Sequence, residues 1–393
     1  MDIQELGVIT LIKAAITGEN ATPPSNFDLE SALAIAKKHQ ISSMLYYGAT
    51  NCGFDENLPV MQNLLMTLYR CIIVSQKQKK EVDSICRAFS ENGIDHMPLK
   101  GTLLREMYPY PDMRLMSDAD ILIKPEQYAA IRPVMEERGF EEVVESDHEL
   151  VWKKSGIVIE LHKRLIPSYN KDYFAYYGDG WKLAVPVHGT PHRYAMSPEN
   201  QMIYLFTHFA KHYRCGGIGL RHITDLYVYR KNTENLDEDY IGAELEKLKL
   251  YEFYVNIMAT VDVWFHDAAP SEKTDLITDV IFASGVFGTN LNRKIAETLI
   301  LKKETTSIEN AKRQRMISMI FPSLENMKFR YAFLEKLPFL LPVAWVMRLF
   351  GIVFFKRKTA KSFYKDMKNV NSENITDYKA VLNYVGLDFN FEE

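Results

Sequence analysis

The spacing of apolar residues changes twice along this 393-residue chain, and these changes constrain the fold most strongly. From Asp2 to about Asn92, apolar residues recur every three or four positions, as they do on one face of a helix. Between Ile94 and about Val187, short apolar or alternating runs are typical of strands. From Ser197 onward the helical spacing returns. Helices should therefore precede and follow one small sheet.

We accordingly predict an α+β fold with three regions. An N-terminal helical region covers residues 1–92, a small mixed-sheet core covers residues 93–187, and a C-terminal helical region covers residues 188–393. Within the core, residues 125–139 have proline in the first turn and glycine at the end, which is typical of a helix. The candidate strands are residues 94–99, 121–124, 141–146, 148–153 and 157–162.

Charge and cysteine content narrow the partners and the compartment. The formal net charge of -4 provides no overall attraction to a polyanion, so we expect no long nucleic acid as a partner. Four scattered cysteines are too few for a disulfide framework. The N-terminal segment has acidic residues where a signal peptide requires basic ones. These features predict a cytoplasmic protein with reduced thiols.

Three carboxylates stand at or within predicted strands. Asp118 and Asp120 are two residues apart and lead into an apolar run, so on an extended chain both side chains project from one face. Glu160 interrupts the apolar run of residues 157–162, and a buried carboxylate needs a cation or a hydrogen-bond donor. On neighbouring strands, these three acids would form an oxygen-rich pocket that suits Mg²⁺ or Mn²⁺ better than zinc.

A candidate phosphate-binding segment precedes the carboxylates. Lys100, Gly101 and Thr102 connect the end of a predicted strand to a predicted helix over residues 102–108. The N–H groups at a helix start favour phosphate, glycine permits a close approach, and lysine adds a positive charge. We therefore predict that these three residues contact phosphate.

Two arginines each have two interpretations. Arg114 either clamps a phosphate or pairs with Asp112 or Asp118. Arg221 and Asp225 are four residues apart on a predicted helix, where they form an ion pair within that helix or line a substrate cleft. The sequence leaves both choices open.

Three histidines are candidates for lining the substrate site. His162 follows Glu160 in the same strand, where it either orients a metal-bound group or has a structural role. His208 and His212 have the spacing of a zinc-binding pair on a helix, but the glutamate of the HExxH motif is missing. For this pair we favour core or substrate-facing side chains over zinc ligands.

Together, these motifs resemble the uncharacterised nucleotidyltransferases of the DNA polymerase beta-like superfamily. The resemblance rests on Pro98–Gly101 (PLKG), Arg114–Asp120 (RxxxDxD) and Glu160–His162, with weaker support from Gly219–Asp225. It implies a nucleotidyltransferase core that transfers NMP from ATP or another nucleoside triphosphate. The acceptor would be a hydroxyl on a small molecule, a protein or an RNA end.

The resemblance also implies a two-metal mechanism. Asp118 and Asp120 would bind both Mg²⁺ (or Mn²⁺) ions, and Glu160 would help to hold the ion that activates the acceptor hydroxyl. Lys100–Thr102 and Arg114 would contact the nucleotide. The broader superfamily usually has Gly-Ser or Gly-Gly where this chain has Lys-Gly-Thr, so its triphosphate recognition should differ in detail.

Two other functions compete with nucleotidyl transfer. Metal-dependent glycosyltransferases also use a DxD motif, but they typically place an apolar strand before it, whereas here the apolar run follows Asp120. A catalytically inactive, nucleotide-binding relative would keep the fold but would be free to lose its acidic residues. The presence of all three acids, Asp118, Asp120 and Glu160, and of Lys100 argues against that loss.

Residues 337–355 are almost wholly apolar, and three basic residues follow them. Their length approaches that of a membrane span, but two prolines and Arg348 oppose insertion. We favour a buried helix pair. The alternatives are a peripheral membrane or partner contact through residues 337–358 and a membrane span.

Overall fold

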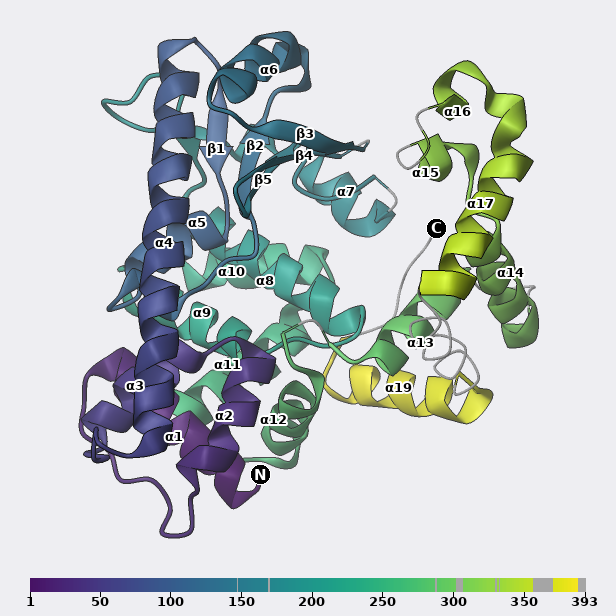
Figure 1. Cartoon of the computed structure of the whole chain (residues 1–393). Coiled ribbons are helices and arrows are strands. Elements are labelled where there is room, and N and C mark those ends of the chain that lie inside the picture. Colours follow the sequence, from purple (N-terminus) through teal and green to yellow (C-terminus); the bar gives the residue numbers. More distant parts are fainter. Residues whose placement is uncertain are drawn as a thin grey trace.

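A computed structural model describes residues 1–146, 148–168, 170–286, 288–301, 307–328, 331, 333–355 and 370–387. Helices make up most of these residues and pack around one five-stranded sheet, with a two-stranded hairpin beside it (Figure 1). The predicted α+β class is confirmed.

The predicted N-terminal helices are present, and three of the four begin with a typical start signal. Asp2 forms a capping box with Glu5, Asp28 caps the second helix, and Pro59 occupies the first turn of the fourth. Gly93 follows the fourth helix with a φ of 69°, a left-handed conformation that glycine adopts readily. These helices are α1 (Ile3–Thr17), α2 (Leu29–His39), α3 (Ser42–Asn51) and α4 (Pro59–Glu91).

The sheet has the strand order β1-β2-β5-β4-β3. Strands β2 and β5 are parallel, and the other neighbours are antiparallel. All five predicted strands are confirmed, within a few residues at their ends. They are β1 (His96–Pro98), β2 (Ala119–Ile123), β3 (Glu141–Glu145), β4 (Glu149–Lys154) and β5 (Ile157–His162).

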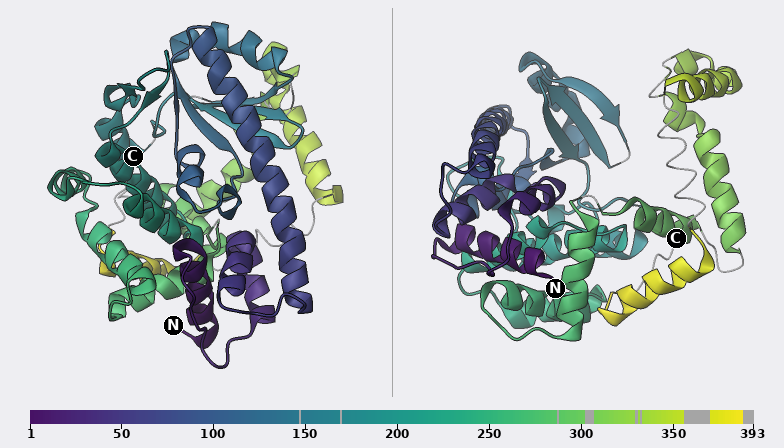
Figure 2. Two further views of the ribbon diagram at one scale, coloured as in Figure 1. Left: turned by 90° about the vertical axis from the view of Figure 1, so that its left-hand side faces the viewer. Right: turned by 60° about the horizontal axis from the view of Figure 1, so that its bottom comes forward.

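One face of the sheet is apolar and buried. Ile121, Trp152 and Ile159 belong to a core that is completed by the second half of α4 and by α6 (Tyr128–Glu137). These helices lie along the same side of the sheet (Figures 1 and 2). Together with a 3₁₀ turn over Pro125–Gln127, α6 confirms the helix predicted for residues 125–139. Because side chains alternate along a strand, the polar residues of β2 and β5 project from the opposite face.

The helices after Ser197 share a second, larger core with α1, α2 and α3. Val8, Phe206 and Phe253 are all buried in it, although they come from distant parts of the chain. Helix α4 contributes to both cores, so it connects the sheet to these helices. The division at residues 92 and 187 remains a prediction. Helix α7 (Lys171–Tyr177) precedes Ser197 and contributes Tyr173 and Tyr177 to the same core. The helices after Ser197 begin with α8 (Pro198–Arg214), α9 (Leu220–Lys231), α10 (Glu238–Lys247), α11 (Tyr251–Phe265) and α12 (Glu272–Ser284).

The remaining described helices lie on the right of Figure 1. Residues 307–355, which we call the C-terminal lobe, have a small core of their own around Met327, Leu334 and Ala344. Helix α13 connects the lobe to the rest of the molecule. The elements are α13 (Asn290–Leu301), α14 (Ile308–Ile320), α15 (Leu324–Lys328), α16 (Phe333–Lys336), a 3₁₀ turn (Pro338–Leu340), α17 (Leu341–Phe355) and α19 (Ser372–Tyr384).

The favoured interpretation of the apolar segment, a buried helix pair, is wrong. Only a short turn and α17 form there, and much of the apolar surface faces solvent: Phe339 is 73% exposed and Phe350 is 60% exposed. The lobe is too small to cover the segment. In the described part of the chain, none of the helices is long and apolar enough to cross a membrane. The basic residues 356–358 lie outside the described residues.

Candidate active site

The parallel pairing of β2 and β5 places two predicted site residues next to each other. Asp120 is the register partner of Glu160. Their neighbours Ile121 and Leu161 turn into the buried core, so both carboxylates project from the other face of the sheet. The alternation that builds the core therefore also creates a carboxylate pair.

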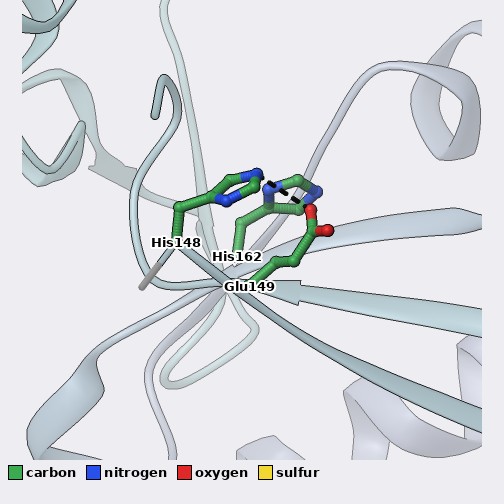
Figure 3. Close-up of side chains that lie close together, drawn as sticks. All are labelled: His148, Glu149 and His162. Atoms are coloured by element: carbon green, nitrogen blue, oxygen red, sulfur yellow. Dashed lines mark ion pairs between the residues drawn. The ribbon is translucent and has the colours of Figure 1, made fainter. Parts of the chain in front are cut away.

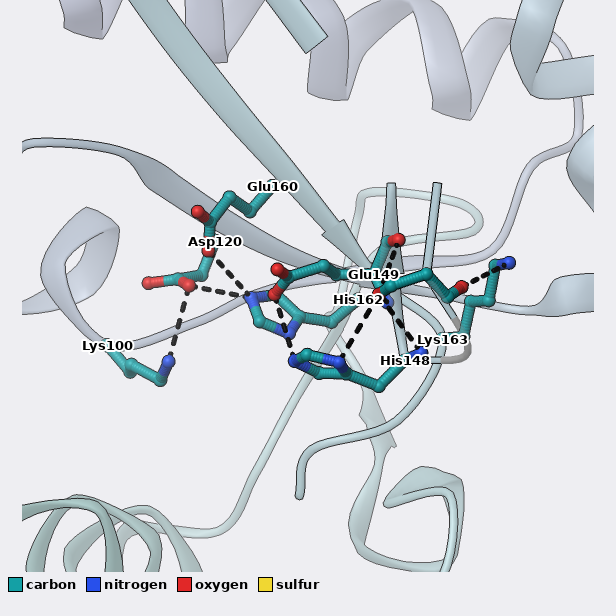
Figure 4. Close-up of polar contacts among 8 residues, drawn as sticks. Lys100, Asp120, His148, Glu149, Glu160, His162 and Lys163 are labelled. Atoms are coloured by element: carbon teal, nitrogen blue, oxygen red, sulfur yellow. Dashed lines mark hydrogen bonds and ion pairs between the residues drawn. The ribbon is translucent and has the colours of Figure 1, made fainter. Parts of the chain in front are cut away.

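The carboxylate pair is surrounded by one lysine and one histidine (Figure 4). Lys100 Nζ lies 3.2 Å from Asp120 Oδ1, and His162 Nε2 lies 2.7 Å from the same oxygen. The distance from His162 Nε2 to Glu160 Oε2 is 3.7 Å. Asp120, Glu160 and His162 each offer a ligand atom within 4.8 Å of the others, a group compact enough to hold a metal ion. Asp118 lies just before β2, outside this compact group.

Burial and neighbouring charges together give these carboxylates very different proton affinities. Burial alone would raise the pKa of Asp120, but Lys100 and His162 outweigh it and hold this pKa well below its usual range. Burial and the negative charges of Asp118 and Asp120 raise the pKa of Glu160 to about 8. Burial and Asp120 also raise the pKa of Asp118. The site therefore has more carboxylates than nearby cations can neutralise.

His162 forms a hydrogen bond with Asp120. Burial lowers its pKa, so the ring is neutral, and Nε2–H donates to Asp120. Among the described residues, its buried Nδ1 has no hydrogen-bond partner. This geometry is consistent with the predicted orienting role.

A second polar group lies beside the first and was not predicted. His148 Nε2 is 2.9 Å from Glu149 Oε2, and with His162 they form another group with closely spaced ligand atoms (Figure 3). Glu149 is the register partner of His162 on the neighbouring strand β4. The sequence signal was weak because His148 and Glu149 stand at the start of an ordinary-looking strand.

These groups open into a cavity of about 640 Å³ between the sheet and helices α8, α9 and α13. Eleven of the twelve predicted site residues line it; the exception, Thr102, lines a neighbouring cavity instead. The eleven are Lys100, Gly101, Arg114, Asp118, Asp120, Glu160, His162, His208, His212, Arg221 and Asp225.

The predicted phosphate-binding helix is much shorter than expected. It consists of α5 (Gly101–Leu104) followed by a 3₁₀ turn, so little helix dipole is available. A Cβ on Gly101 would lie 2.5 Å from Arg114 Nη1. Gly101 is therefore needed for packing against Arg114, whatever its role toward phosphate. Lys100 precedes α5 with a φ of 40° and directs its ammonium group to Asp120.

Neither predicted ion pair involving Arg114 or Arg221 is formed. Instead, Arg114 makes a bidentate pair with Asp225, at 2.7 and 2.9 Å, and Tyr108 donates its hydroxyl to the same carboxylate. Arg221 Nη1 donates to the Leu115 carbonyl oxygen. The correction has a simple cause, because α9 packs against the segment before β2 and brings Asp225 to Arg114. Sequence spacing could not reveal this contact.

The histidines of the helical wall face the cavity. The rings of His208 and His212 are 4.3 Å apart, and His222 of α9 lies near His212. Burial and nearby cations lower the pKa of His212 to about 3, so it is neutral at pH 7. Within the described residues, neither His208 nor His212 belongs to a possible metal-binding group. Their contact with a substrate stays a prediction.

Several further residues on this wall were missed. Lys211 and His222 belong to α8 and α9, and Arg293 and Glu297 belong to α13. None of them forms a recognisable motif. Only Lys211 had an available signal, since it lies between the two histidines that spacing had identified.

The donor set fits a divalent cation. Asp120 and Glu160 offer adjacent carboxylate oxygens, the preferred ligands of Mg²⁺ and Mn²⁺. Burial and the neighbouring carboxylates raise the pKa of Glu160, and a bound cation would favour its ionised form instead.

Two comparisons with known proteins give a match. The model of a family described as "Uncharacterised nucleotidyltransferase" matches residues 25–266, which include the sheet, α4, α8 and α9 but exclude α13. A solution structure of the antibiotic-resistance factor ANT(2'')-Ia is similar over 49% of this chain and 100% of its own, with 14% sequence identity and a TM-score of 0.31. No curated protein matches this chain.

Proposed function

We propose that this chain, which belongs to the uncharacterised nucleotidyltransferase family, transfers NMP from a nucleoside triphosphate to an acceptor hydroxyl with the help of a divalent cation. The single observation that supports a bound cation is the register pairing of Asp120 with Glu160, which both line the cavity described above. When bound, Mg²⁺ or Mn²⁺ would neutralise charge on the triphosphate and lower the pKa of the attacking hydroxyl.

The residues around the carboxylates have distinct proposed roles. Asp120 and Glu160 hold the cation, and Asp118, which lines the same cavity, is the third carboxylate that a two-metal mechanism would use. His162 positions Asp120 through its hydrogen bond. Lys100 holds Asp120 ionised, so this carboxylate is ready to bind a cation at neutral pH.

We assign the triphosphate to the part of the cavity beside these carboxylates. Lys100, Lys211 and Arg221 line it and supply positive charge, whereas the guanidinium of Arg114 is already engaged by Asp225. We therefore propose that Arg114 maintains the shape of the site through its pair with Asp225, rather than binding phosphate as predicted. The acceptor enters along the α8 and α13 wall, where the neutral His208 and His212 can exchange hydrogen bonds with hydroxyl groups.

The test is incubation with each α-labelled nucleoside triphosphate and Mg²⁺ or Mn²⁺ in a cell extract. We compare wild type with Asp120→Asn, which preserves shape, and with Glu141→Gln, an exposed site on the same sheet. Wild type and Glu141→Gln should label the same acceptor, and Asp120→Asn should reduce labelling by more than about 100-fold.

The competing functions predict different results. Metal-dependent binding of nucleotide without any labelled product would indicate the inactive relative. Transfer of sugar from a sugar nucleotide, with no transfer from a nucleoside triphosphate, would indicate the glycosyltransferase. Equal labelling by Asp120→Asn and wild type would refute the proposed role of the carboxylates.

A further inference from the structure

Helix α17 presents an apolar stripe to solvent. Val343, Val346, Met347 and Phe350 are all at least half exposed, and their spacing of three and four residues places them on one face of the helix. Phe339, one turn earlier, is 73% exposed. A set of large apolar side chains on one helix face usually marks a contact surface.

The opposite side of α17 is what attaches it to the C-terminal lobe. Ala344 is buried in the small core, and the Trp345 indole N–H donates to the Pro322 carbonyl oxygen at 2.9 Å. Arg348 Nη1 donates to the Ile320 carbonyl oxygen. The exposed stripe is thus the face left over after the lobe has packed, so substitutions on it should leave the lobe folded.

Charge distinguishes the sequence of this lobe, together with the segment 356–369 that follows it, from the rest of the chain. Residues 307–369 contain 13 Lys or Arg and 4 Asp or Glu, although the whole chain has 47 basic and 51 acidic residues. The basic residues include Arg313, exposed on α14, and the run 356–358 directly after α17. An otherwise acidic protein therefore concentrates positive charge in the part of its sequence that contains α17.

We propose that the C-terminal lobe docks on an anionic membrane surface, with the α17 stripe buried at the headgroup boundary and the basic residues against lipid phosphates. The 15-residue α17 is too short to span a bilayer but long enough to lie along one. Apolar burial and attraction to anionic lipid reinforce each other in such helices, and both are present here. A protein partner without acidic residues at the contact would account for the stripe but not for the excess of positive charge.

Docking would also bring the active-site cavity close to the membrane. Arg293, Ala296 and Glu297 of α13 line the cavity, and α13 contacts α14 of the lobe. Figures 1 and 2 show the lobe extending beyond α13, away from α4. This inference does not depend on the proposed transfer reaction.

The experiment is flotation of the full chain with vesicles of phosphatidylcholine, either alone or mixed with phosphatidylglycerol. Wild type should float only with the mixed vesicles, and high salt should weaken binding. The combined change Val343→Ser, Val346→Ser, Met347→Ser and Phe350→Ser should reduce binding by more than about ten-fold, because most of the buried apolar area is lost. Neutralising the basic run with Lys356→Gln, Arg357→Gln and Lys358→Gln should weaken it independently.

A matched control removes four exposed apolar residues from α4 instead: Met66→Ser, Tyr69→Ser, Ile73→Ser and Val74→Ser. This variant should bind vesicles as wild type does. Failure of wild type to float with anionic vesicles would overturn the proposal, as would equal losses in the α4 and α17 variants. Dimers in light scattering that the α17 changes dissociate, without any vesicle binding, would show instead that the stripe joins two copies of the chain.

Discussion

At the scale of single residues, Glu160 is the most informative group in the site. Its pKa of about 8 results from burial and from the neighbouring Asp118 and Asp120. A carboxyl group that retains its proton at neutral pH must lose it to bind a cation. Proton and metal therefore compete for this side chain.

We predict that cation affinity rises with pH up to about 8 and then levels off. Well below that pH, affinity should increase by up to about ten-fold per pH unit, because binding releases one proton. Titration of Mn²⁺ into the metal-free protein at several pH values, followed by calorimetry, measures this slope. Glu160→Gln should bind more weakly and lose most of the pH dependence; an unchanged slope would exclude Glu160 as the competing group.

The raised pKa of Glu160 also affects the folding stability of the metal-free protein. Glu160 is raised from an ordinary pKa of 4.5, so between about pH 4.5 and pH 8 the folded chain holds a proton that the unfolded chain has lost. This contribution to stability is complete below pH 4.5 and disappears as pH rises through 8. Added Mn²⁺ should restore stability most strongly at the upper end of this range.

At the scale of elements, the pair of Arg114 with Asp225 connects the segment before β2 to α9. Both side chains are buried, and Tyr108 donates a further hydrogen bond to Asp225. Removing one member of a buried pair leaves an uncompensated charge, which typically costs more than the pair itself contributes. The pair of Arg114 with Asp225 thus holds the segment before β2 against α9, and both of these elements line the cavity.

We predict that Arg114→Met lowers the free energy of unfolding by about 3 to 5 kcal/mol. Urea denaturation measures this loss. The double variant Arg114→Met with Asp225→Leu should recover part of it, because no buried charge is left unpaired. As a control, Arg230→Met breaks a more exposed pair with Glu238 and should cost less than about 1 kcal/mol. Similar losses at both sites would contradict the structural role of the buried pair.

At the scale of the whole molecule, His39 connects three helices from distant parts of the chain. Its Nδ1 accepts a hydrogen bond from the Leu220 N–H at the start of α9, and its Nε2 lies 3.3 Å from the Phe282 carbonyl oxygen in α12. Burial and Lys38 lower its pKa from 6.5 to about 4. The hydrogen bond from the Leu220 N–H requires an unprotonated Nδ1 and therefore a neutral ring, whereas the contact with the Phe282 carbonyl oxygen does not.

We predict that His39 makes the fold sensitive to acid. Between about pH 6.5 and pH 4 the unfolded chain binds a proton that the folded chain excludes, so stability falls as pH falls through this window. The contribution is on the order of 3 kcal/mol. Unfolding of His39→Asn at pH 7 and pH 4.5 should show lower stability at pH 7 and a smaller further loss on acidification. The exposed His188→Asn should retain the wild-type pH dependence, and an equal effect of both changes would contradict this prediction.

The sequence by itself determined the elements and the main acidic residues of the site. Strand and helix periods follow from local alternation, so the five strands, the N-terminal helices and α6 were predictable. An acid such as Glu160 within an apolar strand is conspicuous because burying it is costly. Eleven of the twelve predicted site residues line one cavity. The motifs that identified them lie at the ends of strands and on the helices that face the sheet.

Only the tertiary structure decided which residues meet. The parallel register of β2 and β5 pairs Asp120 with Glu160. The packing of α9 pairs Asp225 with Arg114 rather than with Arg221. Neither contact can be predicted from the spacing of nearby residues in the sequence, because the partners are 40 or more residues apart. The same holds for the exposed face of α17. Apolar composition describes what a helix can bury, but whether it is buried depends on the surface that the rest of the fold provides.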